Sequence, residues 1–171
     1  MKTIKIYLEV RELVYDIQNK AHLVGKAEKN LSNKNAEAIS NIQLSDEDDE
    51  MYQIKRSLNT AYSRLLLILS EYISSKQAAE GINKLNEIID ENGTLEIEFR
   101  LTDNYHDSAT QTLTDAIHSY LVNVSLAEWL AVMDKDYAQI YATLSESDVK
   151  AIIKSLYCRK RPVKPQKEEE I

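Results

Sequence analysis

Proline is missing from the first 161 residues of this 171-residue chain, and this feature most limits the folds open to it. Both prolines, Pro162 and Pro165, lie in the last ten residues, and the chain has only three glycines. Gly and Pro supply most tight turns, so the chain lacks the residues that join short strands in β-sandwiches. The same shortage argues against collagen-like chains, Pro-rich linkers and glycine-rich phosphate-binding loops. The sequence therefore predicts a mainly α chain with few, long helices.

Apolar residues recur at spacings of three and four along most of the chain, which is the spacing of a helix face. In the N-terminal segment, residues 1–27, this spacing predicts a helix over residues 8–26, and alternation leaves a possible short strand at residues 3–8. The predicted helical body covers residues 46–157. Its strongest pattern is an apolar stripe from Met51 to Tyr72, which predicts one helix over residues 46–75 with Ser45 as its cap.

Further helices are expected later in the body. They are a helix over residues 78–89 that ends at Asn92-Gly93, a helix from Ser108 to Met133, a short helix over residues 137–144 and a last helix that starts at Ser145.

Residues 94–101, TLEIEFRL, form the one clear strand pattern. Leu95, Ile97, Phe99 and Leu101 share one face and are expected to pack inward. Backbone groups of a strand need partners. The pattern leaves three partners open: the N-terminal segment, another copy of the chain, or a different chain.

Two segments lack a helical or strand pattern. Residues 28–45 are rich in Asn and Ser and are expected to form a loop or arm. Residues 158–171 are first basic and then acidic, and they are expected to form a tail that leaves the body at Pro162. The predicted fold is therefore an elongated helical bundle with one short strand or hairpin, an extended N-side arm and a C-terminal tail.

The chain is acidic, with a formal net charge of −7. Residues 35–50 contain six acidic residues and no basic residue. Wrapping around nucleic acid needs clustered Lys and Arg, so DNA is expected at most to pass by without sequence-specific contact. The basic stretch RKRPVKPQK leaves two interpretations open, a contact with nucleic acid or an acidic partner and a solvated tail. No membrane association is expected, because the longest apolar run, Leu65–Leu69, is far too short to span a bilayer.

No catalytic, metal or cofactor-binding residue is expected, and the chain is predicted not to be an enzyme. Asp115 and His118 form a D-x-x-H pair, but a di-iron bundle needs a second such pair, which is missing. Cys158 lies beside basic residues without a paired His, so a small apolar role is favoured. The acidic run DEDDE lacks the Gly and the spaced Glu of a calcium loop and suits a solvated helix start.

The chain has ten tyrosines but only one Phe and one Trp. A Tyr ring with its polar tip suits surfaces that are wet in the free protein and buried in a complex. Aromatic, strand and basic residues are therefore the candidates for interfaces: Tyr52, Tyr62, Leu95, Ile97, Phe99, Tyr105, Trp129, Tyr137, Tyr141, Arg159, Lys160 and Arg161.

Several segments together resemble a known group of proteins. They are the opening KIYLEVRELVYDIQNKAHLVGKAEKN, the strand LEIEFRL with Tyr105 after it, DAIHSYLVNVSLAEWL, DYAQIY and the closing RKRP. The chain is similar to small helical proteins encoded among the virion genes of tailed phages and prophages of gut Bacteroidetes. The likeness covers most of the chain except the Asn-rich arm and the extreme tail.

The resemblance implies a structural virion protein, made in the cytoplasm of the bacterial host. Such a protein would form a homo-oligomeric neck ring, a head–tail connector that joins the portal to tail components and lets DNA pass. Its implied partners are further copies of itself and other virion proteins. The alternative is a soluble bacterial adaptor or regulator that binds a partner helix along the stripe from Met51 to Tyr72.

Overall fold

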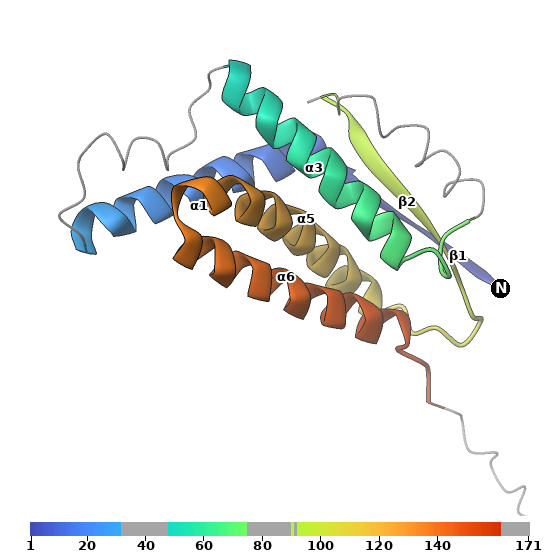
Figure 1. The fold of residues 1–171 in the computed structure, drawn as a ribbon. Helices are drawn as coiled ribbons and strands as arrows, with labels where there is room; N and C mark the ends of the chain where they lie inside the picture. Colours follow the sequence, from blue (N-terminus) through green and yellow to red (C-terminus); the bar gives the residue numbers. More distant parts are fainter. Residues whose placement is uncertain (32–47, 75–89, 91, 162–171) are drawn as a thin grey trace, which may run out of the picture.

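The computed structural model describes residues 1–31, 48–74, 90 and 92–161 (Figure 1). The described residues form four helices and a two-stranded antiparallel sheet, which confirms the mainly α fold with one short strand pair. In chain order the elements are β1 (Lys2–Glu9), α1 (Val10–Leu31), α3 (Asp48–Ile68), β2 (Thr94–Leu101), α5 (Ala109–Met133) and α6 (Lys135–Leu156). Most of the predicted arm, the helix predicted over residues 78–89 and the tail from Pro162 lie outside the described residues.

The strand predicted at residues 94–101 is present and pairs with the N-terminal segment. β1 and β2 run antiparallel in a register that joins Lys2 to Leu101 and Glu9 to Thr94. Successive side chains of a strand point to opposite faces, so Ile6, Ile97 and Phe99 share the inner face and are buried. Of the three partners left open by the sequence, the chain uses its own first residues.

α5 is the central helix of the fold (Figure 1). Seven consecutive residues, Tyr120–Leu126, are buried, which requires neighbours around the whole helix. α1, α3 and α6 all pack against it. By length and composition alone α5 is apolar enough to cross a membrane, but half of its most apolar window is buried inside the fold, as in a core helix.

α1 begins later and ends later than predicted. The first strand extends to Glu9, and the helix runs over Val10–Leu31 in place of residues 8–26. The arm predicted from residue 28 therefore starts inside the helix. Ile17 and Ala21 are fully buried in the apolar stripe that the spacing predicted.

The helix predicted over residues 46–75 is shorter than expected, because α3 ends at Ile68. With 21 residues it is about 32 Å long at 1.5 Å per residue. The chain then turns, with the Tyr72 N–H donating to the Leu69 carbonyl at 2.8 Å. The Arg100 N–H donates to the Tyr72 carbonyl at 2.6 Å, so the turn after α3 is bonded to β2.

The two helices predicted at residues 137–144 and from Ser145 are one continuous helix, α6. Asp134 caps it, accepting the N–H groups of Asp136 and Tyr137 at 3.1 and 3.3 Å. The Ser145 hydroxyl donates to the Ala142 carbonyl at 2.7 Å, a bond within the helix that starts no new one.

Ser108 was expected to cap the helix up to Met133, and it does precede α5. Its side chain makes no capping bond, because the hydroxyl lies 2.7 Å from His106 Nδ1. The position of the helix start was therefore right, but the predicted capping contact was wrong.

The chain does not leave the body directly after α6. Cys158–Lys160 runs antiparallel beside Asn104–His106, and Tyr105 forms a bridge with Arg159. The His106 N–H donates to the Cys158 carbonyl at 3.1 Å, and the Lys160 N–H donates to the Asn104 carbonyl at 2.8 Å. The first residues of the predicted tail are therefore fixed to the fold.

Candidate functional site

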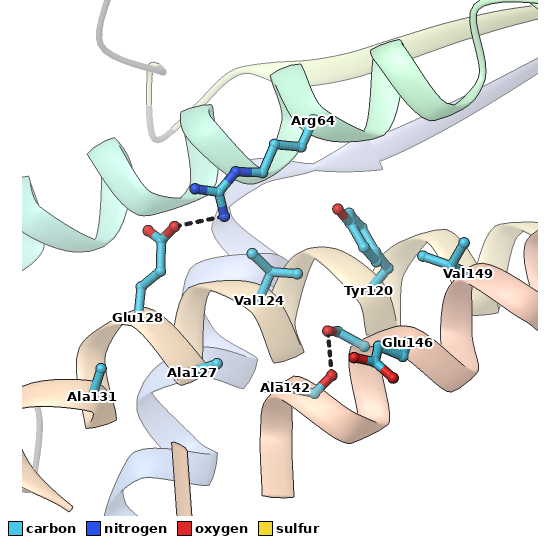
Figure 2. A pocket seen from close by; sticks show the side chains of 10 residues that line it. Arg64, Tyr120, Val124, Ala127, Glu128, Ala131, Ala142, Glu146 and Val149 are labelled. Atoms are coloured by element: carbon cyan, nitrogen blue, oxygen red, sulfur yellow. Dashed lines mark hydrogen bonds and ion pairs between the residues drawn. The ribbon is translucent and has the colours of Figure 1, made fainter. Parts of the chain in front are cut away.

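A groove of about 430 Å³ lies between α3, α5 and α6 (Figure 2). α5 contributes half of the lining residues, among them the buried Tyr120 and Val124 and two alanines further along the helix. Arg64 of α3 and residues of α6 form the remaining sides. The lining residues are Arg64, Tyr120, Val124, Ala127, Glu128, Ala131, Ala142, Ser145, Glu146 and Val149.

An ion pair spans the groove from α3 to α5. Arg64 Nη1 lies 2.9 Å from Glu128 Oε1, and both side chains are partly exposed, 57% and 32%. A pair this exposed contributes about 0.2–1 kcal/mol. Burial raises the pKa of Tyr120 beside this pair, and the nearby Arg64 charge opposes that shift. The phenol therefore stays neutral at physiological pH and offers a hydrogen bond, not a charge.

A line of polar groups links three helices inside the fold. Lys20 Nζ of α1 donates to Asn123 Oδ1 of α5 at 3.2 Å, and Asn123 Nδ2 donates to Asp148 Oδ2 of α6 at 2.8 Å. Asn123 is buried, and burial raises the pKa of Asp148. This line fixes how the three helices sit against one another, and sequence reasoning missed it. The only signal was a lone Asn inside the apolar run LVNVSL.

The Asp115–His118 pair is not brought together. His118 Nε2 instead lies 2.7 Å from Asp16 Oδ2 of α1, and Asp115 accepts a bond from Gln111 at 2.8 Å. Among the described residues no group of three or more His, Cys, Asp and Glu side chains gathers at one point. The contact of His118 joins α1 to α5.

Aromatic residues and Arg159 cluster where α6 ends. The Tyr72 and Tyr157 rings meet edge to face with centroids 5.9 Å apart, and Arg159 lies over the Tyr157 ring at 5.8 Å. The hydrogen bond with Tyr157, together with burial, raises the pKa of Tyr72 to about 12. Arg159 Nη1 also donates to the Leu156 carbonyl at 2.6 Å, so its guanidinium group is hydrogen-bonded within the subunit. Lys160 and Arg161 are exposed.

Three of the predicted interface residues are inside the subunit. Ile97, Phe99 and Tyr105 are each 0% exposed, so none can present a side chain to a neighbour without unfolding. Burial within the subunit argues against an interface role for these three side chains, because the inward face of β2 and the turn after it close the core. The expected inward packing of the strand is confirmed for Ile97, Phe99 and Leu101, while Leu95 is half-buried.

The other interface candidates reach the surface to different degrees. Tyr52 is exposed, with Arg56 over its ring at 5.0 Å. Tyr62 is half-buried and donates its hydroxyl to the Glu96 carbonyl at 3.1 Å. Trp129, Tyr137 and Tyr141 are partly buried against the core. Their role in an interface stays a prediction.

Several exposed apolar residues were not among the candidates. They lie on every described helix and directly after α6, and they include Tyr15, Leu23, Leu67, Val132, Met133, Ile140, Leu144 and Tyr157. Ile140 and Leu144 belong to the spacing that predicted a short helix, and spacing alone does not tell a buried face from an exposed one.

Comparison with protein-family models, with curated proteins and with solved structures finds no match to this chain.

Proposed function

We propose that this chain is a structural virion protein of a tailed phage, a subunit of the neck or head–tail connector ring. In this role it joins the portal to tail components through contacts with further copies and with other virion proteins. DNA passes through the ring without sequence-specific contact. The resemblance in the sequence motivates the proposal, and one observation on the folded chain supports it.

That observation is the wide distribution of exposed apolar side chains. Tyr15 of α1, Leu67 of α3, Val132 of α5 and Ile140 of α6 are all more than half exposed. Single exposed apolar residues are common on proteins, but a subunit with neighbours on several sides needs apolar contacts on several sides. This distribution favours assembly over a single docking site.

The charge of the chain suits a ring through which DNA passes. The net charge of −7 repels a passing polyanion. Arg159 also bonds within the subunit, which reduces the basic surface that the tail offers to phosphates.

The surface that the sequence suggested for the adaptor alternative is buried in the fold. Ile54, Leu58 and Leu65 of the Met51–Tyr72 stripe are at most 2% exposed, because α3 buries this face in its own subunit. A partner helix therefore cannot lie along the stripe while the fold is intact.

Protein mass spectrometry of density-gradient-purified particles, from a host whose prophage carries this gene, tests the proposal. The expected result is this chain in the particle fraction in a fixed ratio to the portal protein, resistant to high-salt washing. Absence from purified particles, with the chain abundant in the cell lysate, would contradict it and favour a cellular adaptor.

A further inference from the structure

The two edges of the β1–β2 sheet are unequal. The Arg100 N–H donates to Tyr72, so the backbone groups of Arg100 point away from β1. Backbone groups alternate sides along a strand. The backbone N–H and C=O groups therefore point toward α3 at Arg100 and also at Glu98, Glu96 and Thr94. There the Glu96 carbonyl accepts a bond from the Tyr62 hydroxyl, so this edge of β2 is covered.

The same alternation identifies which residues of β1 face outward. Leu101, Phe99, Ile97 and Leu95 turn their backbone groups to β1, where their partners are Lys2, Ile4, Ile6 and Leu8. The Val10 N–H, donating to the Gly93 carbonyl at 3.1 Å, continues this even-numbered series. The N–H and C=O groups of Thr3, Lys5, Tyr7 and Glu9 consequently point to the other edge. Within the described part of the chain, no strand pairs with that edge.

An open strand edge is a template for another extended chain. The β1 residues whose backbone groups face this open edge include charged ones, and their order indicates which chain can pair there. Lys5 and Glu9 lie on either side of Tyr7, two positions from it in each direction. A second β1 that runs antiparallel about Tyr7 places Lys5 of each copy opposite Glu9 of the other. Centring the pair on Lys5 would instead oppose two lysines, and centring it on Ile6 would match Lys5 with Tyr7.

We propose that β1 pairs with β1 of a second copy of this chain, antiparallel and centred on Tyr7, to form a four-stranded sheet. Tyr7, which is 57% exposed, then meets Tyr7 of the second copy across the two-fold axis. Lys5 already contacts Glu96 and Glu98 at 2.6 and 3.5 Å, so its ammonium is held over the outer face of the sheet. On the inner face of the four-stranded sheet, Ile6 of one copy then lies beside Leu8 of the other.

This pairing goes beyond the proposed function. A symmetric contact closes on itself and makes a pair, either of free subunits or of subunits in two facing rings. It is tested on the isolated protein, whereas the virion role is tested on particles, so one can fail without the other.

Charge-reversed chains give the sharpest test. Lys5→Glu opposes two glutamates at each contact, and Glu9→Lys opposes two lysines. Each variant alone should therefore associate about tenfold more weakly than the wild type in sedimentation equilibrium at low salt. An equimolar mixture of the two variants restores both contacts and should recover association between unlike chains. A mixture that associates no better than either variant alone would overturn the proposal.

Proline tests the backbone bonds separately. Tyr7→Pro removes an N–H that the β1–β2 ladder does not use, so the fold should survive and the pairing should be lost. Tyr7→Val is the matched control, because it keeps the N–H while removing the ring. Circular dichroism checks that both variants fold. Association of folded Tyr7→Pro at wild-type strength would contradict the proposal, as would a wild-type chain that stays monomeric at millimolar concentration.

Discussion

At the scale of single residues, the side chain of Asn123 joins three helices. It connects Lys20 of α1 to Asp148 of α6 from inside the core. Asn123→Ala removes both bonds and leaves the partly buried carboxylate of Asp148 without its donor. We expect a loss of about 1–3 kcal/mol in the free energy of unfolding, measured by urea denaturation. Gln139→Ala on the exposed side of α6 is the control and should change it by less than about 0.5 kcal/mol.

Asp148 gives this connection a pH dependence. Burial raises the pKa of its carboxyl group, so the native state holds the proton more tightly than the unfolded chain does. The charged carboxylate therefore costs stability at neutral pH, and this cost disappears as the pH falls through the raised pKa. Asp148→Asn keeps a hydrogen-bond acceptor but cannot titrate.

Lowering the pH from 7 to about 4 should consequently raise the stability of the wild type relative to Asp148→Asn. Urea midpoints of both chains at three or four pH values measure this difference, and groups common to both chains cancel. A difference that moves in favour of Asp148→Asn at low pH would show that the carboxylate is stabilised in the fold.

Tyr105 is a buried residue with an unused polar group. Its ring is 0% exposed, and its hydroxyl has no hydrogen-bond partner among the described residues. Removing a buried polar atom that makes no bond relieves its desolvation cost. Tyr105→Phe should therefore leave the thermal midpoint unchanged or raise it. A loss of more than about 1 kcal/mol would reveal a bond to this hydroxyl.

The sequence predicted the burial of apolar residues better than the contacts of polar ones. The three-and-four spacing predicted the apolar stripe from Met51 to Tyr72, and Leu58 and Leu65 of this stripe are buried, because a helix repeats its face whatever lies opposite. The partners of Asn123 and His118 depend on where α6 and α1 lie in space. Spacing along one helix carries no information about that placement.

At the scale of elements, the start of α6 is the clearest correction, and it is open to a direct test. The structure caps the helix with Asp134, whereas the sequence pattern favoured a new helix at Ser145. Asp134→Ala should lower the free energy of unfolding by about 0.5–2 kcal/mol. Ser145→Ala should cost less, because its hydroxyl bonds only within a continuing helix. The opposite order of the two effects in urea denaturation would contradict a single helix.

The ends of elements were less predictable than their existence. β2 has the predicted bounds because strict alternation is a local signal. α3 ends before the segment at Tyr72 that bonds to β2, and β2 is distant from Tyr72 in sequence. The pairing of β1 with β2 likewise joins two segments that lie before α1 and after α3 in the chain, so the sequence left it open.

At the scale of the whole molecule, the described fold buries its apolar stripes on α5 and leaves other apolar side chains exposed on each helix. The groove between α3, α5 and α6 is lined mainly by alanines and other apolar groups around one exposed ion pair. These features support a subunit that acts through its surfaces. The proposed function comes from the resemblance, since spacing and composition describe a fold and not a partner.

The measurement that tests this role most directly is cryo-electron microscopy of the neck of purified phage particles from a host that carries this gene. We expect a ring beneath the portal whose subunits fit the β1–β2 sheet with α1, α3, α5 and α6. A neck that contains no density for this fold, in particles that package DNA normally, would contradict it.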